Sequence, residues 1–159
     1  MGRALFLLFP LWFFATKSEA IDLSATGGWG ETVDGSDLVS GAGTDLIDTY
    51  ESLTEATYLT ISNCLDDSDS WRVDARLVDD GGWFGGFILY VKRTSDGTGN
   101  GSISGELSFI EITSIDTPLF FGAGDRGDIT VQYKLAGMSI NVSPSNYDTM
   151  VLFTVVDIP

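Results

Sequence analysis

Few side chains in this sequence could do chemistry, because its 159 residues include no histidine and a single cysteine, Cys64. A cysteine nucleophile needs a base that holds it as a thiolate, and no histidine is present to serve. Paired carboxylates, as in glycosidases, are the remaining option. Glu106 and Glu111 stand at an odd spacing, so on a regular strand they would face opposite sides and could not pair. We therefore predict that the protein is not an enzyme.

The densest group of carboxylates is formed by Asp66, Asp67 and Asp69. Calcium takes six to eight oxygen ligands, and these residues could supply some of them, but the EF-hand pattern with its glycine and terminal glutamate is absent. Asp79 and Asp80 follow the expected strand 71–78, whereas the first cluster precedes it. The two acidic groups would therefore lie at opposite ends of that strand and would not share one ion. The sequence favours a solvated acidic loop, with structural calcium as the weaker alternative and no other cofactor.

Two large aromatic residues, Trp83 and Phe84, stand between glycine pairs in the segment Gly81–Gly86. Flat rings with flexible flanks can form a glycan-stacking or hydrophobic docking site, and aromatic residues are favoured at binding hot spots. The alternative is that Trp83 begins the following strand and packs inward. Trp83 and Phe84 are therefore the ligand candidates of this sequence, with a glycan as one candidate partner.

The first twenty residues are typical of a secretory signal peptide. A basic residue, Arg3, precedes the apolar run Ala4–Ala15, and Ser18-Glu19-Ala20 offers small residues at both positions that determine cleavage. The apolar run is too short for an ordinary membrane span. We predict that residues 1–20 are removed and that residues 21–159 form one domain without a membrane span. The expected location is extracellular, in solution or at the cell surface.

The remaining chain is strongly acidic. The whole sequence has 8 basic and 23 acidic residues, and losing Arg3, Lys17 and Glu19 leaves six basic and 22 acidic ones, for a net charge of −16. Proteins that bind phosphate backbones release counterions with lysine and arginine, so nucleic acid is excluded as a partner.

Three smaller features leave alternatives open. Cys64 has no partner in the chain, so it is either a buried small hydrophobe or an intermolecular disulfide candidate. Asn100 and Asn141 fit the glycosylation acceptor pattern, which matters only in a eukaryotic source. The integrin-type tripeptide Arg126-Gly127-Asp128 is short enough to recur by chance.

Alternation of apolar and polar residues predicts strands near 59–61, 71–77, 87–91, 129–135 and 147–155, and no stretch keeps a helical period. Glycine-rich segments at 79–82 and 95–101 are typical of reversals between antiparallel strands, so we expect strand 71–78 to pair with strand 86–93. Residues 26–52 predict a first strand and a long surface connection, with one helical turn near Asp45. The expected fold is an all-β antiparallel sandwich of immunoglobulin-like or jelly-roll type, with seven to nine strands.

The segment Tyr147–Val156 is apolar on both faces, with Val151 and Phe153 on one side and Met150 and Leu152 on the other. Such a strand is buried centrally or covered by another chain. The run Pro144-Ser145-Asn146-Tyr147-Asp148-Thr149-Met150-Val151-Leu152-Phe153-Thr154-Val155 resembles the closing turn and strand of spore-coat-U-like and related pilin subunits.

That resemblance implies a secreted, non-enzymatic subunit of a filament, coat or surface layer. Its partners would be copies of itself or another surface protein. Such subunits lend an extended segment to a neighbour's open sheet, where backbone hydrogen bonds give affinity. The candidate donor is Ile21–Ala25, with Ile21 and Leu23 as its apolar residues, and Val151 and Phe153 of the last strand are the other assembly candidates. The alternative is that Ile21–Ala25 is an ordinary first strand of its own domain.

Overall fold

The computed structural model describes residues 20–105 and 107–158. The signal-peptide prediction and Glu106 therefore fall, except for Ala20, outside the described residues. The described residues form ten strands and one short 3-10 helix: β1 (Asp22–Gly27), η1 (Gly35–Asp37), β2 (Thr49–Glu51), β3 (Thr57–Ser62), β4 (Ser70–Val78), β5 (Ile88–Arg93), β6 (Ile103–Gly105), β7 (Ile110–Ile112), β8 (Thr117–Ala123), β9 (Arg126–Ala136) and β10 (Met150–Asp157).

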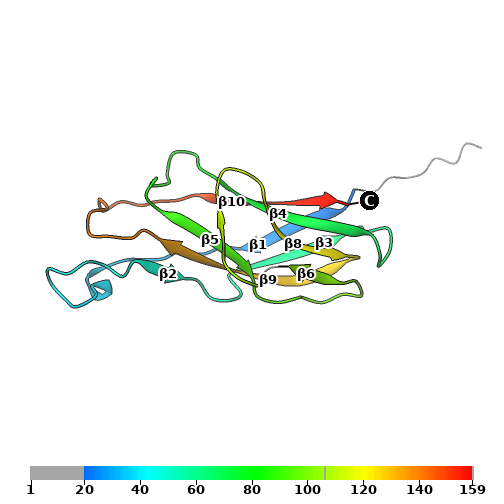
Figure 1. Cartoon of the computed structure of the whole chain (residues 1–159), viewed down its shortest axis with the longest axis horizontal. Coiled ribbons are helices and arrows are strands. Elements are labelled where there is room, and N and C mark those ends of the chain that lie inside the picture. The colour runs from blue at the N-terminus through cyan, green and yellow to red at the C-terminus, as the bar shows by residue number, and fades with distance from the viewer. Residues whose placement is uncertain (1–19, 106, 159) are drawn as a thin grey trace, which may run out of the picture.

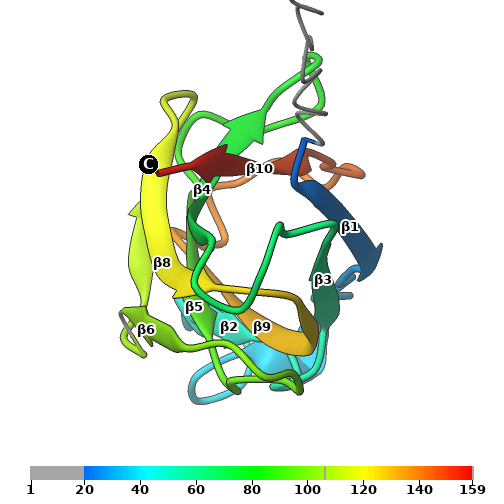
Figure 2. The same ribbon diagram turned by 90° about the vertical axis from the view of Figure 1, so that its right-hand side faces the viewer.

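The strands form two antiparallel sheets packed face to face (Figures 1 and 2). The larger sheet has the order β1-β3-β9-β5-β7, with β2 also paired to β9, and the smaller sheet has the order β10-β4-β8-β6. This arrangement confirms the all-β antiparallel sandwich. The described residues contain ten strands where the sequence predicts seven to nine, because short strands such as β6 and β7 carry too few residues for a visible alternation.

The connections differ from the predicted hairpins. From β3 onward, every connection between successive strands crosses from one sheet to the other. The expectation that strand 71–78 pairs with strand 86–93 is wrong: β4 pairs with β10 and β8, while β5 pairs with β9 and β7. The glycines at 79–82 and 95–101 reverse the chain, but across the core instead of within one sheet.

Inward-facing residues of both sheets fill one continuous core around Trp71, which is fully buried in β4. Its ring meets the ring of Phe120 edge to face, with the centroids 6.1 Å apart, and its Nε1 donates a 2.9 Å hydrogen bond to the Gly124 carbonyl. The alternation predicted for residues 71–77 is therefore present, with Trp71, Val73 and Ala75 buried.

The long connection after β1 contains η1 instead of the helical turn predicted near Asp45. Asp34 caps η1 by accepting a 2.7 Å hydrogen bond from the Ser36 N–H, and Asp37 accepts one in return from the Asp34 N–H. This reciprocal capping is readable as an acidic residue three positions after an N-cap aspartate. The carboxylate of Asp45 instead accepts hydrogen bonds from the N–H groups of Leu46 and Ile140, which lowers its pKa.

Candidate assembly edge and ligand cavity

The last strand, β10, lies at an edge of the smaller sheet. Among the described residues it pairs with β4 alone, so one row of its backbone groups has no strand beside it. In Figure 2 the strand runs along the rim of the sandwich, next to β1 of the other sheet. The sequence predicts a strand that is buried centrally or covered by another chain, and the first of these alternatives is wrong.

The register identifies the open backbone groups. Antiparallel pairs alternate between residues that exchange hydrogen bonds and residues that do not. The N–H of Ile158 donates a 2.9 Å hydrogen bond to the Ser70 carbonyl, which places the even-numbered residues of β10 in the bonded positions facing β4. The N–H and C=O groups of Val151, Phe153 and Val155 therefore point to the open side.

Both faces of β10 are apolar. Val151, Phe153 and Val155 pack against the core, whereas Leu152 and Val156 are half-buried on the outer face and Met150 is 62% exposed there. Asp157, at the end of the strand, is its only charged residue. Natural sheets protect edge strands with charges, prolines or bulges, and β10 has none of these over Met150–Val156.

The candidate donor segment is placed in the neighbouring edge strand of its own chain. Leu23 lies opposite Ile61 in the pairing of β1 with β3, and both Ile21 and Leu23 pack against the core. β1 pairs with β3 alone among the described strands, so the larger sheet also ends in an open edge. The structure thus contains the arrangement of an ordinary first strand.

A cavity of about 670 Å³ opens between the two sheets beside these edges. Its wall includes Val151 and Phe153 of β10, the residues that follow β1, and the loop that precedes β10. Six aromatic side chains line it: Trp29, Trp83, Phe87, Tyr133, Tyr147 and Phe153. The structure therefore brings Trp83, a ligand candidate, together with two assembly candidates that are almost 70 residues away in the sequence.

Trp83 and Phe84 do not form one stacking platform. Trp83 is half-buried and packs edge to face on Phe87, with the ring centroids 5.4 Å apart. Phe84 is 39% exposed and contacts Phe87 and Tyr147 at centroid distances of 5.1 and 6.0 Å. Trp83 packs inward, as one alternative predicts, and borders the cavity, but it does not begin the following strand, because β5 starts at Ile88.

The floor of the cavity carries two buried hydroxyls. Thr57 Oγ1 and Tyr133 Oη lie 2.8 Å apart in a hydrogen bond, and burial raises the pKa of Tyr133. Among the described residues, the charged members of the lining are Glu31 and Asp148, both exposed at the rim, and none is a lysine or arginine. Apart from this hydroxyl pair, the cavity is mainly apolar inside, and it is negative at its mouth.

The acidic loop uses its carboxylates to hold its own backbone. Asp66 accepts hydrogen bonds of 2.8 and 2.6 Å from the N–H and hydroxyl of Ser68, which lower its pKa, and Asp69 accepts one of 2.8 Å from the Leu65 N–H. Asp67 lines a smaller cavity of about 230 Å³ together with Asp66. Among residues 20–105 and 107–158, no group of three acidic or cysteine side chains is placed to hold a metal ion. Calcium remains a prediction that this geometry does not support.

Cys64 lies beside this loop. Burial and a hydrogen bond to Asp125 raise the pKa of its thiol to about 12. A thiol in this state is a poor nucleophile, because the thiolate is the reactive form.

We expect Cys64 to react slowly with iodoacetamide at pH 8, at a rate about 100-fold or more below that of the unfolded chain. Mass spectrometry of native and urea-unfolded protein checks this, and equal rates would contradict it.

The raised pKa of Cys64 also makes the stability of the protein depend on pH. The contribution of this thiol to the free energy of unfolding is complete below the pKa of the unfolded chain and is lost as the pH rises toward 12. Cys64→Ala should therefore lose less melting temperature than the natural protein between pH 8 and pH 11.

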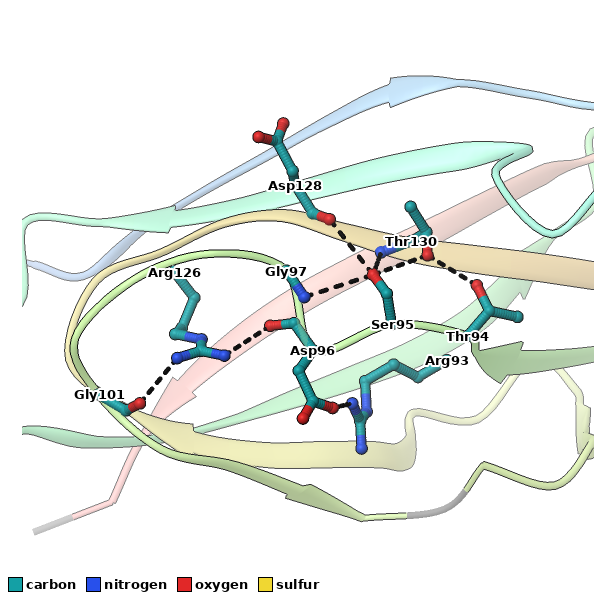
Figure 3. A network of polar contacts seen from close by, with 9 residues as sticks. All are labelled: Arg93, Thr94, Ser95, Asp96, Gly97, Gly101, Arg126, Asp128 and Thr130. Atoms are coloured by element: carbon teal, nitrogen blue, oxygen red, sulfur yellow. Dashed lines mark hydrogen bonds and ion pairs between the residues drawn. The ribbon is translucent and has the colours of Figure 1, made fainter.

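Two buried arginines fix the glycine-rich loop between β5 and β6 (Figure 3). Arg126 is 8% exposed and donates hydrogen bonds of 3.1, 2.7 and 2.8 Å to the carbonyls of Gly99, Gly101 and Asp96. Arg93 is 3% exposed and forms an ion pair with Asp96. The Arg126-Gly127-Asp128 tripeptide therefore cannot present its arginine to a receptor.

Sequence reasoning missed these arginines and the cavity. For Arg93, the signal that could have been used is an arginine at a core position of a strand that precedes a glycine-rich loop. The cavity has no such signal, since its walls come from distant segments. Both acceptor asparagines, Asn100 and Asn141, are exposed, and their glycosylation stays a prediction.

Comparison with protein families, curated proteins and solved structures gives no match for this chain. Among residues 20–105 and 107–158, no helix is long and apolar enough to cross a membrane. The features of the structure that bear on function are therefore the β10 edge and the cavity.

Proposed function

We propose that the protein is a secreted, non-enzymatic subunit of an extracellular filament, coat or surface layer, and that it assembles through the open edge of β10. The observation that carries this proposal is an edge strand with apolar residues on both faces and unprotected backbone groups along one side. A strand from another molecule can add to such an edge, with backbone hydrogen bonds giving affinity and alternate side chains giving register.

The position of the two open edges bears on the form of the assembly. A contact between β10 of one copy and β10 of another would be isologous and would close a dimer. A contact between β10 of one copy and β1 of the next would be heterologous and could continue along a filament. Because β1 and β10 both end their sheets, we propose the heterologous contact for a filament of this subunit.

Electrostatics sets a condition for this assembly. The chain without residues 1–20 has a net charge of −16, so its copies repel one another at low ionic strength. The Debye length falls from about 30 Å at 0.01 M salt to about 10 Å at 0.1 M. Assembly through backbone and apolar contacts should therefore strengthen with added salt.

Sedimentation velocity and electron microscopy of the protein beginning at Ile21 test the proposal. The expected result is a concentration-dependent series of species larger than the monomer, with filaments or sheets in the images, at physiological salt. A monomer at every concentration, with and without calcium, would contradict the proposal.

Deleting residues 21–25 distinguishes the two roles of the first strand. Since Leu23 is paired into the larger sheet, we expect the deletion to lower the free energy of unfolding by about 2–4 kcal/mol, from lost burial of two partly covered apolar side chains and lost strand hydrogen bonds. Urea unfolding measures this. A shortened protein with normal stability that fails to assemble would contradict the intramolecular placement and assign these residues to a neighbour.

A second candidate function, binding of an extracellular ligand, is favoured by the cavity that Trp83 lines. Its volume falls in the range of about 300–1,000 Å³ that small-molecule sites occupy. A glycan is a weaker choice for this cavity than the sequence suggests, because Trp83 is half-buried and Phe84 is not part of the described lining.

A further inference from the structure

The cavity opens to solvent between the two sheets. Its volume of about 670 Å³ is within the range of about 300–1,000 Å³ that small-molecule sites occupy. Its floor is made of buried residues, including Phe87, Leu89 and Leu135, and its rim is made of exposed ones, including Glu31 and Asp148. A small molecule can therefore enter the cavity from solvent and exchange contact with water for contact with apolar side chains.

The charges of the lining discriminate between ligands. An anion entering the cavity would pass two carboxylates, Glu31 and Asp148, and would meet no lysine or arginine among the lining residues that the structure describes. It would also leave water without a compensating partner, which is costly for any charged group. An uncharged molecule avoids both costs.

The interior favours rings and one hydrogen-bonding group. Trp83, Phe87 and Tyr147 form a continuous aromatic wall, with Phe87 5.4 Å from Trp83 and 5.2 Å from Tyr147 between ring centroids. The hydroxyls of Thr57 and Tyr133 share one hydrogen bond, so the pair keeps one donor hydrogen and acceptor lone pairs for a ligand.

From the volume, the aromatic wall and the charges we infer that the cavity is a binding site for an uncharged, mainly apolar small molecule and that it rejects anions. The inference deepens the second candidate function and is independent of assembly. It is tested on dilute protein that sedimentation shows to be monomeric, so that its failure and a failure of assembly are seen separately.

Two fluorescent probes with the same ring skeleton provide the test. N-phenyl-1-naphthylamine is uncharged, and 8-anilinonaphthalene-1-sulfonate is its sulfonated, anionic counterpart. The uncharged probe should bind saturably, at one site, with a dissociation constant at least tenfold lower than that of the sulfonate. Absence of saturable binding, or equal affinity for the two probes, would overturn the inference.

Filling the cavity locates the site. Val142 lines the cavity from a loop, so Val142→Trp should weaken binding of the uncharged probe at least tenfold. Val39→Trp is the matched control, because Val39 is a 64% exposed loop valine outside the lining. Circular dichroism and melting temperature confirm that both variants fold. Equal binding by Val142→Trp and Val39→Trp would place the probe elsewhere and overturn the inference.

Charge reversal at the rim tests the discrimination. Glu31→Lys should strengthen binding of the sulfonate severalfold and leave the uncharged probe within twofold. Glu55→Lys changes the net charge equally at an exposed residue outside the lining and should change neither probe by more than twofold. Equal effects of the two lysines would overturn selection at the rim. If the uncharged probe fails to bind while Val142→Trp abolishes assembly, the inference is overturned in favour of a segment of a second copy as the occupant.

Discussion

Replacing Trp71 with alanine should lower the free energy of unfolding by about 3–5 kcal/mol, the range for removing a large aromatic side chain from a core. Trp71 is fully buried, packs edge to face on Phe120, and donates its indole N–H to the Gly124 carbonyl. The substitution leaves a void between the sheets and an unsatisfied carbonyl. Equilibrium unfolding in urea measures the loss.

Trp29→Ala is the matched control. Trp29 is half-buried and already borders the cavity, so its removal enlarges an existing space and should cost less than half as much as Trp71→Ala. Equal losses for the two variants would mean that Trp71 is not the centre of the core.

Replacing Arg126 with methionine should destabilise the protein by about 3–5 kcal/mol, because a hydrogen bond from a charged donor contributes about 1.5–3 kcal/mol and this side chain donates three. Methionine retains much of the apolar stem, but three carbonyls of the loop between β5 and β6 lose their donor. Hydrogen exchange should increase in residues 94–101 before it increases in the core strands, because this loop depends on the guanidinium.

The corresponding control is Arg76→Met. Arg76 has a side chain that is 40% exposed and forms a 3.4 Å ion pair with Asp116, an arrangement worth about 1 kcal/mol or less. If Arg76→Met is as destabilising as Arg126→Met, or if residues 94–101 keep their protection in Arg126→Met, the assigned role of Arg126 is wrong.

The strands can be predicted well from the sequence, but the way in which they are connected cannot. The alternation around Trp71 and Val73 depends on which side chains face the core, and that is a local property of a strand. A glycine-rich reversal such as 79–82 has the same local chemistry whether the chain returns within one sheet or crosses to the other. The choice is made by the packing of both sheets, which is why the hairpin between 71–78 and 86–93 was wrongly predicted.

The candidate site is predictable only in its parts. Trp83, Val151 and Phe153 are identifiable from the sequence as unusual apolar residues, but no local pattern indicates that they border one cavity. The sequence shows that both faces of β10 are apolar. It does not show that β10 lies at an edge, because that position depends on the order of the strands in the sheet. Likewise, the carbonyls of Gly99 and Gly101 accept hydrogen bonds from Arg126, which lies about 25 positions further along the chain, so no local pattern indicates this contact.

If the open edge of β10 mediates assembly, Val155 allows a direct test of it. Its N–H points away from β4, so Val155→Pro removes an outward donor without removing a hydrogen bond to β4, and proline is tolerated at such edge positions. Val155→Ala shortens the side chain but keeps the N–H.

Sedimentation velocity of these two variants, at matched concentration and salt, is the decisive measurement. We expect similar melting temperatures for the two variants, assembly of Val155→Ala, and a monomer for Val155→Pro. Assembly of a folded Val155→Pro to the same extent as Val155→Ala would contradict the claim that molecules join through this edge.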